Sequence, residues 1–235
     1  MSSSVRQLRA IMYKEIIDIT KNKALILINI LFPIMSIIFS QVLGGEEIKE
    51  IMPMIILFHT TMAPMISIAS IIGDEKEKYT LRYLILAGIQ PETYLVAIGL
   101  IICGISTLTS SIFILQLNVD AMVKLLNFYI VSASEIVISS IIGATIGLII
   151  KNQLSVGVLA APVGMILSFI PFAGEINTKI GYIAKYVFSN VNYCILNKLE
   201  YRCSISDYKY YFVNLCFFIL LFRLSFKKRG LNLSE

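Results

Sequence analysis

Six long apolar runs, separated by short charged or turn-forming segments, organise this chain. They cover residues 24–43, 51–73, 94–117, 125–150, 154–172 and 210–224. A helix needs about 20 apolar residues to cross the hydrocarbon core of a bilayer. The sixth run has only about 15, so it has to begin a turn earlier or tilt. The pattern predicts an all-α polytopic membrane protein with six transmembrane helices.

The composition agrees with this prediction and excludes soluble classes of protein. Apolar residues make up 57% of the 235 positions, charged residues only 15%, and the mean hydropathy is +0.81. Soluble domains are nearer half apolar and a quarter charged. The net charge of +5 comes from basic residues in short blocks between the apolar runs. We therefore expect the lipid bilayer as a partner, and no nucleic acid.

The basic residues also predict an orientation, because cytoplasmic loops carry the excess of Lys and Arg. With the N-terminus inside, 13 of the 20 basic residues fall in cytoplasmic segments. The prediction is a multi-pass protein of the cytoplasmic membrane, with both termini in the cytoplasm.

Two segments outside the spans are informative. In residues 4–22, apolar residues recur at helical intervals, opposite charged residues. The apolar residues are Val5, Leu8, Met12, Ile16 and Ile19. This is typical of an amphipathic helix on the inner membrane face; the alternative is a plain helical extension of the first span. Residues 173–209 hold only short apolar stretches and predict an outer loop, a cap with shallow re-entrant pieces.

Motifs for catalysis and metal binding are missing from the sequence. It has no G-x-x-x-x-G-K-[ST] nucleotide-binding loop, no C-x-x-C pair and a single histidine, His59. The Glu46-Glu47 pair with His59 is similar to part of the motif of CAAX-type proteases, but the further histidines of that motif are missing. We therefore expect no metal site, no catalytic residues and no enzyme activity in this chain.

The segment 74–93 carries the most specific pattern. It opens with Asp-Glu-Lys-Glu-Lys and continues into a short amphipathic helix with Leu81, Leu84 and Ile85 on one side. This run resembles the cytoplasmic loop of ABC-2 type transporter permeases, where alternating acidic and basic residues, a glycine and a threonine open the coupling helix that docks on the ATPase. The matching residues are Glu75, Lys76, Glu77, Lys78, Thr80, Leu81 and Leu84. Tyr79 stands where the family usually has glycine, and Gly88 stands near its usual proline.

The resemblance extends through the amphipathic start, the six spans and the turn at 151–153. It implies a single permease domain over residues 1–235 that holds no cofactor and forms a homodimer, or pairs with a closely similar permease. A separate ABC ATPase subunit would carry ATP and Mg²⁺. The residues expected to couple to that ATPase are Glu75, Glu77, Thr80, Leu81, Arg82, Leu84, Ile85 and Asn152.

Several residues inside the spans are candidates for a substrate pathway between the second and fifth spans of two protomers. They are Phe58, His59, Met62, Met65, Glu135, Met165 and Phe169. An ionisable side chain inside a membrane costs free energy unless it is paired or hydrated. The flexible side chain of methionine adapts to varied apolar ligands. The alternatives are helix packing for the methionines and, for Glu135, hydrogen bonds to the serines at 132, 134, 139 and 140.

Two further pairs lead to structural expectations. Gly143 and Gly147 form a small-residue face that predicts the close approach of another helix within the protomer. Cys194 and Cys203 flank a ten-residue segment of the outer loop and form a possible disulfide, with two free thiols as the alternative.

Together these features favour the permease subunit of an ATP-driven ABC-2 type exporter. The apolar, methionine-rich second span favours an amphipathic or hydrophobic cargo, such as a peptide toxin or bacteriocin. Small permeases that resemble this chain include exporters of phenol-soluble modulins. Drugs, lipids and ions are alternative cargoes, and a non-transport membrane protein, such as an immunity factor or assembly scaffold, is the alternative class.

Overall fold

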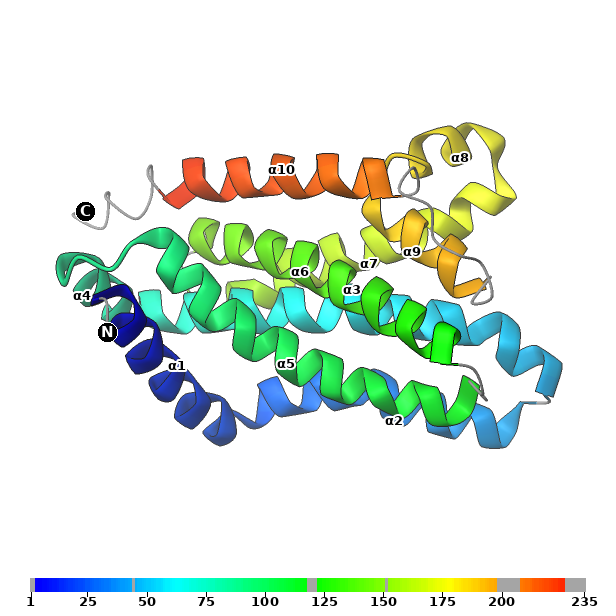
Figure 1. Cartoon of the computed structure of the whole chain (residues 1–235), viewed down its shortest axis with the longest axis horizontal. Coiled ribbons are helices and arrows are strands. Elements are labelled where there is room, and N and C mark those ends of the chain that lie inside the picture. The colour runs from blue at the N-terminus through cyan, green and yellow to red at the C-terminus, as the bar shows by residue number, and fades with distance from the viewer. Residues whose placement is uncertain (1–2, 44, 118–121, 151, 198–207, 227–235) are drawn as a thin grey trace.

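The computed structural model describes residues 3–43, 45–117, 122–150, 152–197 and 208–226, and every element within these ranges is an α-helix (Figure 1). In chain order they are α1 (Ser3–Lys21), α2 (Lys23–Val42), α3 (Gly45–Glu77), α4 (Thr80–Leu86), α5 (Pro91–Leu117), α6 (Met122–Ile149), α7 (Ser155–Ile176), α8 (Thr178–Ala184), α9 (Phe188–Asn197) and α10 (Tyr208–Ser225). The all-α prediction is therefore confirmed for the described part of the chain.

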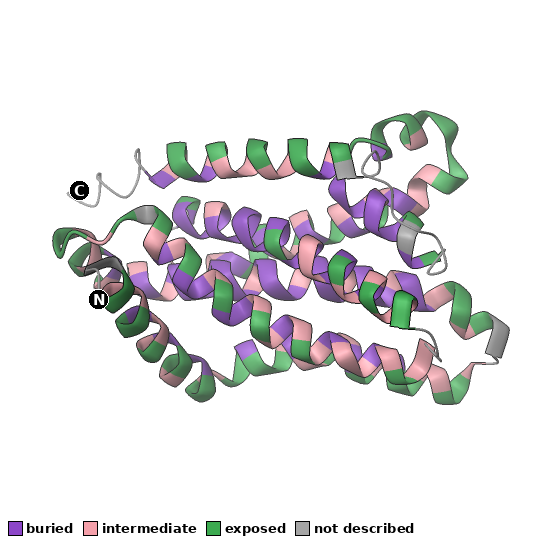
Figure 2. Cartoon of the chain, viewed as in Figure 1, coloured by how far each residue is buried: buried purple, intermediate pink, exposed green. Residues whose placement is uncertain are grey.

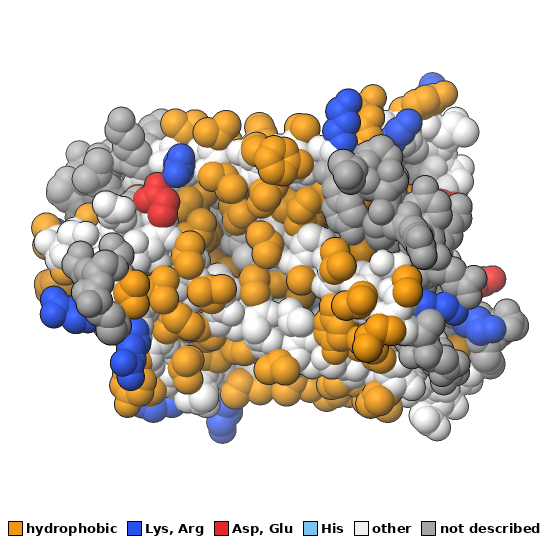
Figure 3. Space-filling view, in the orientation of Figure 1, with side chains coloured by type: hydrophobic (Ala, Val, Ile, Leu, Met, Phe, Trp, Pro, Cys, Tyr) orange, Lys and Arg blue, Asp and Glu red, His pale blue; other side chains and the backbone are white. Residues whose placement is uncertain are grey.

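Five of the described helices are long and apolar enough to cross a membrane: α2, α3, α5, α6 and α7. They coincide with the first five apolar runs of the sequence, as a multi-pass membrane protein requires. The face in Figure 3 is covered by hydrophobic side chains along the middle of the bundle, with Lys and Arg gathered toward its two ends. Lipid tails solvate such a surface, whereas water would not.

The sixth apolar run coincides with α10, which is not among these five helices. α10 has 18 residues and carries Lys209 near its start and Arg223 near its end. Six spans therefore remain a prediction of the sequence.

α3 is the central helix of the bundle. It packs against α2, α5, α6 and α7, and its apolar part is the most buried of the five candidate spans (Figure 2). Its 33 residues rise about 50 Å, which exceeds the ~30 Å hydrocarbon core. The last turn of α3 thus contains Asp74 to Glu77, which the sequence analysis assigned to a loop. The helix continues through these charges because Glu75, Lys76 and Glu77 meet partners on neighbouring elements and Asp74 pairs with Lys78.

Close contact between α3 and α6 depends on two glycines. A Cβ atom at Gly143 would lie 2.3 Å from the backbone oxygen of Met65, and one at Gly147 would lie 2.8 Å from the Cβ of Ile72. Neither site leaves room for a side chain. The predicted close approach of a helix to this small-residue face is confirmed, and α3 is the helix that makes it.

α1 and α2 are separate helices rather than one continuous span. Asn22 lies between them in extended conformation, and its side-chain oxygen accepts hydrogen bonds from the backbone N–H groups of Ala24 (3.1 Å) and Leu25 (3.3 Å). These bonds satisfy donors that a helix start leaves free. The alternative of a plain helical extension of the first span is therefore wrong. The position of α1 on a membrane surface remains a prediction.

The expected outer loop, 173–209, is partly helical. α7 runs on to Ile176, and α8 and α9 follow with 7 and 10 residues, too few to cross a bilayer. α9 packs against α3, α6, α7 and α10. This segment forms a helical cap at the end of the bundle opposite α4 (Figure 1).

The glycine contact gives a direct test of the α3–α6 packing. We expect Gly143→Ala to destabilise the protein by about 1–3 kcal/mol, since the added methyl group must displace the backbone of α3. Gly104→Ala on α5 is the matched control, because a Cβ there has no neighbour within 4 Å. The measurement is the temperature at which detergent-purified protein loses its monodisperse gel-filtration peak. Equal temperatures for wild type and Gly143→Ala would contradict the close contact.

Candidate functional site at the α4 end of the bundle

The short helix α4 lies between the end of α3 and the start of α5, at the same end of the bundle as the start of α1 and the end of α10 (Figure 1). Two residues with positive φ bracket it: Tyr79 at 59° and Gly88 at 76°. An L-residue with a side chain adopts this left-handed conformation only at a cost of about 1–2 kcal/mol. The chain therefore makes a tight turn on each side of α4.

α4 presents its predicted apolar face to its own bundle. Leu81 is only 2% exposed, and Leu84 and Ile85 pack partly buried against the same core cluster as Tyr94 of α5. These three residues were expected to couple to an ATPase, but the protein's own core covers Leu81 and packs against Leu84 and Ile85. The outward surface instead consists of Tyr79, Arg82, Tyr83 and Leu86, with Tyr83 69% and Leu86 73% exposed.

A buried carboxylate joins α1, α3 and α5 directly beneath α4. Glu75, 3% exposed, forms an ion pair with Lys14 of α1 and accepts a hydrogen bond from the phenol of Tyr94. The backbone oxygen of Glu75 accepts a hydrogen bond from the Thr80 hydroxyl at the start of α4 (3.1 Å). Glu75 was expected to couple to an ATPase. Its carboxylate is occupied within the chain instead.

Glu15 is a second acid in this junction, and it lies on the inward stripe of α1 between Ile11 and Ile19. All three side chains are almost fully buried. Burial, and next the negative charge of Glu75, raise the pKa of Glu15 to about 7, although Lys14 opposes the shift with an ion pair at 2.7 Å. Burial by itself lowers the pKa of Lys14, but the charges and hydrogen bonds of Glu75 and Glu15 outweigh it and raise that pKa. Two acids thus share one cation.

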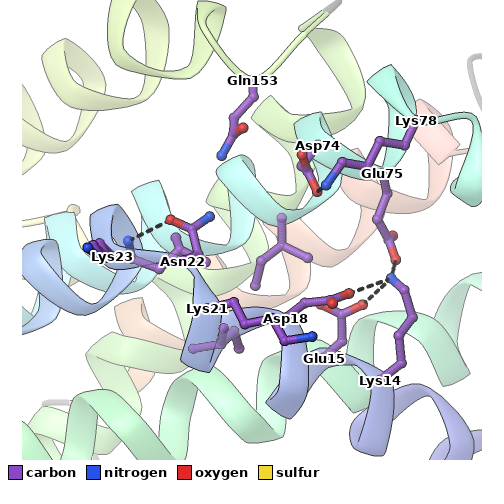
Figure 4. A pocket seen from close by; sticks show the side chains of 13 residues that line it. Lys14, Glu15, Asp18, Lys21, Asn22, Lys23, Asp74, Glu75, Lys78 and Gln153 are labelled. Carbon is purple, nitrogen blue, oxygen red and sulfur yellow. Dashed lines mark hydrogen bonds and ion pairs between the residues drawn. The ribbon is translucent and has the colours of Figure 1, made fainter.

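This junction forms one wall of a pocket of about 520 Å³ between α1, the start of α2 and the end of α3. Figure 4 shows the carboxylates of Glu15 and Glu75 meeting at Lys14, with Asp74 and Lys78 beside Glu75, and Gln153 above them. Lys78 pairs with Asp74 at 2.8 Å. The lining mixes acids and bases without one dominant sign, so the pocket has no strong preference for an anion or a cation.

The turn after α6 forms a second connection to the end of α3. Lys76 donates hydrogen bonds to the backbone oxygens of Leu148 (2.8 Å), in the last turn of α6, and of Ile150, which follows the helix. A cation is favoured at such a helix C-terminus. On the other side of the turn, the backbone N–H of Gln153 donates to the exposed Glu77 (3.2 Å).

Asn152 was expected to couple to the ATPase. In the structure its side chain forms hydrogen bonds at the start of α7. Its side-chain oxygen accepts hydrogen bonds from the backbone N–H (3.1 Å) and hydroxyl (2.6 Å) of Ser155 at the start of α7. Its neighbour Lys151 lies outside the described residues.

The expected pathway residues divide into two groups. Phe58 and Met62 of α3 meet α7, where the rings of Phe58 and Phe169 lie 4.9 Å apart and Met62 packs on Gly164. Met165 is 50% exposed and Phe169 36% exposed on the outer face of α7. Met65, His59 and Glu135 are 0% exposed inside the bundle. The structure therefore does not bring all seven side chains to one cavity within a single protomer.

Glu135 and His59 are partnered on different sides of α3. Glu135 accepts hydrogen bonds from the hydroxyls of Thr60 (2.9 Å) and Thr61 (2.7 Å), so its partners are threonines of α3 rather than the serines of its own helix. His59 lies with its Nε2 atom 3.2 Å from the backbone oxygen of Ser106 on α5. Whether either residue has a role in transport remains a prediction.

The structure describes only one of the two cysteines of the possible disulfide. Cys194 is an exposed residue of α9, whereas Cys203 lies outside the described residues, so the bond remains a prediction.

Sequence reasoning missed Glu15 and Tyr94 as members of the junction. One signal was present for Glu15, a carboxylate four residues from Ile11 and four from Ile19 on one helical stripe. Tyr94 gave no such signal, because a tyrosine at the start of a membrane span is also typical of an interfacial residue.

Comparison with known proteins adds no relative: no protein family matches this chain, and neither a curated protein nor a solved structure does.

The raised pKa of Glu15 predicts a pH dependence of stability. The folded state binds the Glu15 proton more tightly than the unfolded state, so stability falls as the pH rises from about 4.5 to 7. A shift from 4.5 to about 7 corresponds to an upper limit of about 3 kcal/mol. We expect Glu15→Gln to raise the thermal stability of purified protein at pH 8 and to leave it nearly unchanged at pH 5.

Asp18→Asn is the matched control, because Asp18 lies 3.7 Å from the same lysine but is 56% exposed. Its effect should be small at both pH values. A Glu15→Gln protein that is less stable than wild type at pH 8 would contradict the charge arrangement.

Proposed function

We propose that this chain is the membrane permease subunit of an ATP-driven ABC-2 type exporter, with α4 as the helix that contacts a separate ATPase. The matching run 75–84, described above, is the basis of this assignment. Both termini and α4 would then lie on the cytoplasmic side of the cytoplasmic membrane. ATP and Mg²⁺ would bind to the partner, because this chain has no nucleotide-binding loop.

The conformation of Tyr79 is the observation that carries the proposal. The family motif has glycine at this position, and the residue here has a φ of 59°, in the region that glycine adopts most readily. A left-handed residue at this point turns the chain from α3 into α4. The agreement between the residue type of the motif and the backbone at the matching position supports the same loop geometry in this chain.

The surface of α4 also fits a docking role. Tyr79, Tyr83 and Leu86 are 65%, 69% and 73% exposed, beside the exposed Arg82. Tyrosine and arginine are enriched among the residues that dominate binding energy at protein interfaces. On the inner side, Leu81 and the Glu75 junction attach α4 to α1, α3 and α5, so that a force applied to α4 would reach three long helices.

A cavity for cargo would need two protomers. Met165 and Phe169 face outward from α7, and a second copy of the chain would enclose them together with Phe58. An apolar surface of this kind favours a hydrophobic or amphipathic cargo, such as a peptide. A non-transport role, as an immunity factor or a scaffold, is the competing function, and it predicts no ATPase partner.

The test uses an outward-facing residue of α4. We expect Tyr83→Asp to weaken association with the ATPase encoded beside this chain at least tenfold, which corresponds to about 1.4 kcal/mol. Tyr182→Asp is the matched control, since Tyr182 is 74% exposed on α8 at the opposite end of the bundle. Co-purification and cargo-stimulated ATP hydrolysis in lipid vesicles are the measurements. No ATPase bound to wild type would reject the permease assignment, and equal binding by both variants would reject α4 as its contact.

A further inference from the structure

An apolar groove of about 390 Å³ lies on the outside of the bundle between α5, α6 and α10. Its deepest residues are Ile141 and Phe222, which are 7% and 1% exposed, and its open edges are formed by Val96, Leu100 and Val137. Figure 3 shows this face of α5, α6 and α10, on which hydrophobic side chains predominate. The groove is part of the surface that lipid tails contact.

The length of the groove corresponds to one leaflet of a bilayer. On α5 it extends from Glu92 to Cys103, and these eleven steps of helix rise about 16 Å. Half of the hydrocarbon core is about 15 Å thick. The groove therefore has the length of one acyl chain that lies along α5 within a single leaflet.

A second apolar groove begins at the same point. It has a volume of about 270 Å³, lies between α1 and α5, and is also lined by Glu92 and Val96, together with Val5 and Leu8. The two grooves thus diverge from one place on either side of Val96. A molecule with two hydrocarbon chains on a single headgroup matches this arrangement.

The shared starting point carries one acid and one base. Arg223 Nε lies 3.2 Å from Glu92 Oε1, and the two side chains are 58% and 50% exposed. A guanidinium group binds a phosphate oxygen well, and a carboxylate accepts hydrogen bonds from a primary ammonium group. A choline headgroup has no N–H to donate, and a glycerol headgroup brings no positive charge to Glu92.

We propose that α5 holds one phospholipid whose headgroup carries both a phosphate and a primary ammonium group, as in phosphatidylethanolamine. The phosphate binds Arg223 and the ammonium binds Glu92. One acyl chain fills the groove between α5, α6 and α10, and the first part of the other lies in the groove between α1 and α5. The lipid thereby connects α1, α5 and α10 at the α4 end of the bundle, and this site does not depend on the proposed function.

A pair of glycines on α5 allows a clean test of the groove. A Cβ atom at Gly99 or at Gly104 meets nothing within 4 Å, but only Gly99 lines the groove. Gly99→Leu should fill the groove without disturbing the core, and Gly104→Leu adds the same side chain to the same helix elsewhere. The probe is palmitoyl-oleoyl phosphatidylethanolamine titrated into delipidated protein in detergent, with bound lipid counted by native mass spectrometry. We expect Gly99→Leu to weaken binding of the first lipid at least fivefold, and Gly104→Leu to leave it unchanged.

The headgroup preference is tested with phosphatidylglycerol and phosphatidylcholine of the same acyl chains. Wild type should bind phosphatidylethanolamine at least fivefold more tightly than either, and Glu92→Gln should reduce this preference to less than twofold. Equal binding of the three lipids by wild type would overturn the headgroup assignment. Equal binding by Gly99→Leu and Gly104→Leu would overturn the groove as the lipid site. A change from dimer to monomer in Gly99→Leu, with lipid binding unchanged, would show instead that a second copy covers the groove.

Discussion

The interior of a bilayer offers no water to a polar group, so polar side chains within the spans have to find partners on other helices. In this protein α3 supplies many of them. Thr60 and Thr61 donate to Glu135 of α6, and Ser67 accepts from Asn29 of α2, which in turn accepts from Ser106 of α5. These bonds fix which face each of α2, α3, α5 and α6 turns toward its neighbours. The close approach at Gly143 and Gly147 then determines how near α6 lies to α3.

The same constraint acts at the α4 end, where the groups are charged. Glu75 is buried among helices and needs both Lys14 and Tyr94 as partners, so that α1, α3 and α5 are joined at one carboxylate. Burial, and next the negative charge of Glu75, raise the pKa of Glu15, which shares the same lysine. Glu75 therefore links α1 and α5 to the end of α3, and its backbone oxygen binds Thr80 at the start of α4. This is the physical basis on which a contact at α4 would influence the spans.

Two outer surfaces of the bundle differ in shape and in charge. On α7, Met165 and Phe169 form a broad exposed face that a second helix or a large apolar cargo could cover. Between α5, α6 and α10 the surface is an apolar groove that ends at an ion pair. In the two proposals, a second protomer or a cargo would cover the α7 face and one lipid would fill this groove.

The sequence by itself determined the helical class, the positions of five long apolar helices, the short helix after α3 and the close packing at Gly143 and Gly147. These features depend on composition and spacing within one segment, because contact with lipid sets the hydropathy of each helix. Only the tertiary structure decided which side of each helix is buried. Leu81 faces inward, Glu15 lies in the core and Glu135 pairs with threonines of α3. A membrane helix is apolar on the side that meets lipid as well as on the side that meets protein, so its periodicity does not distinguish the two.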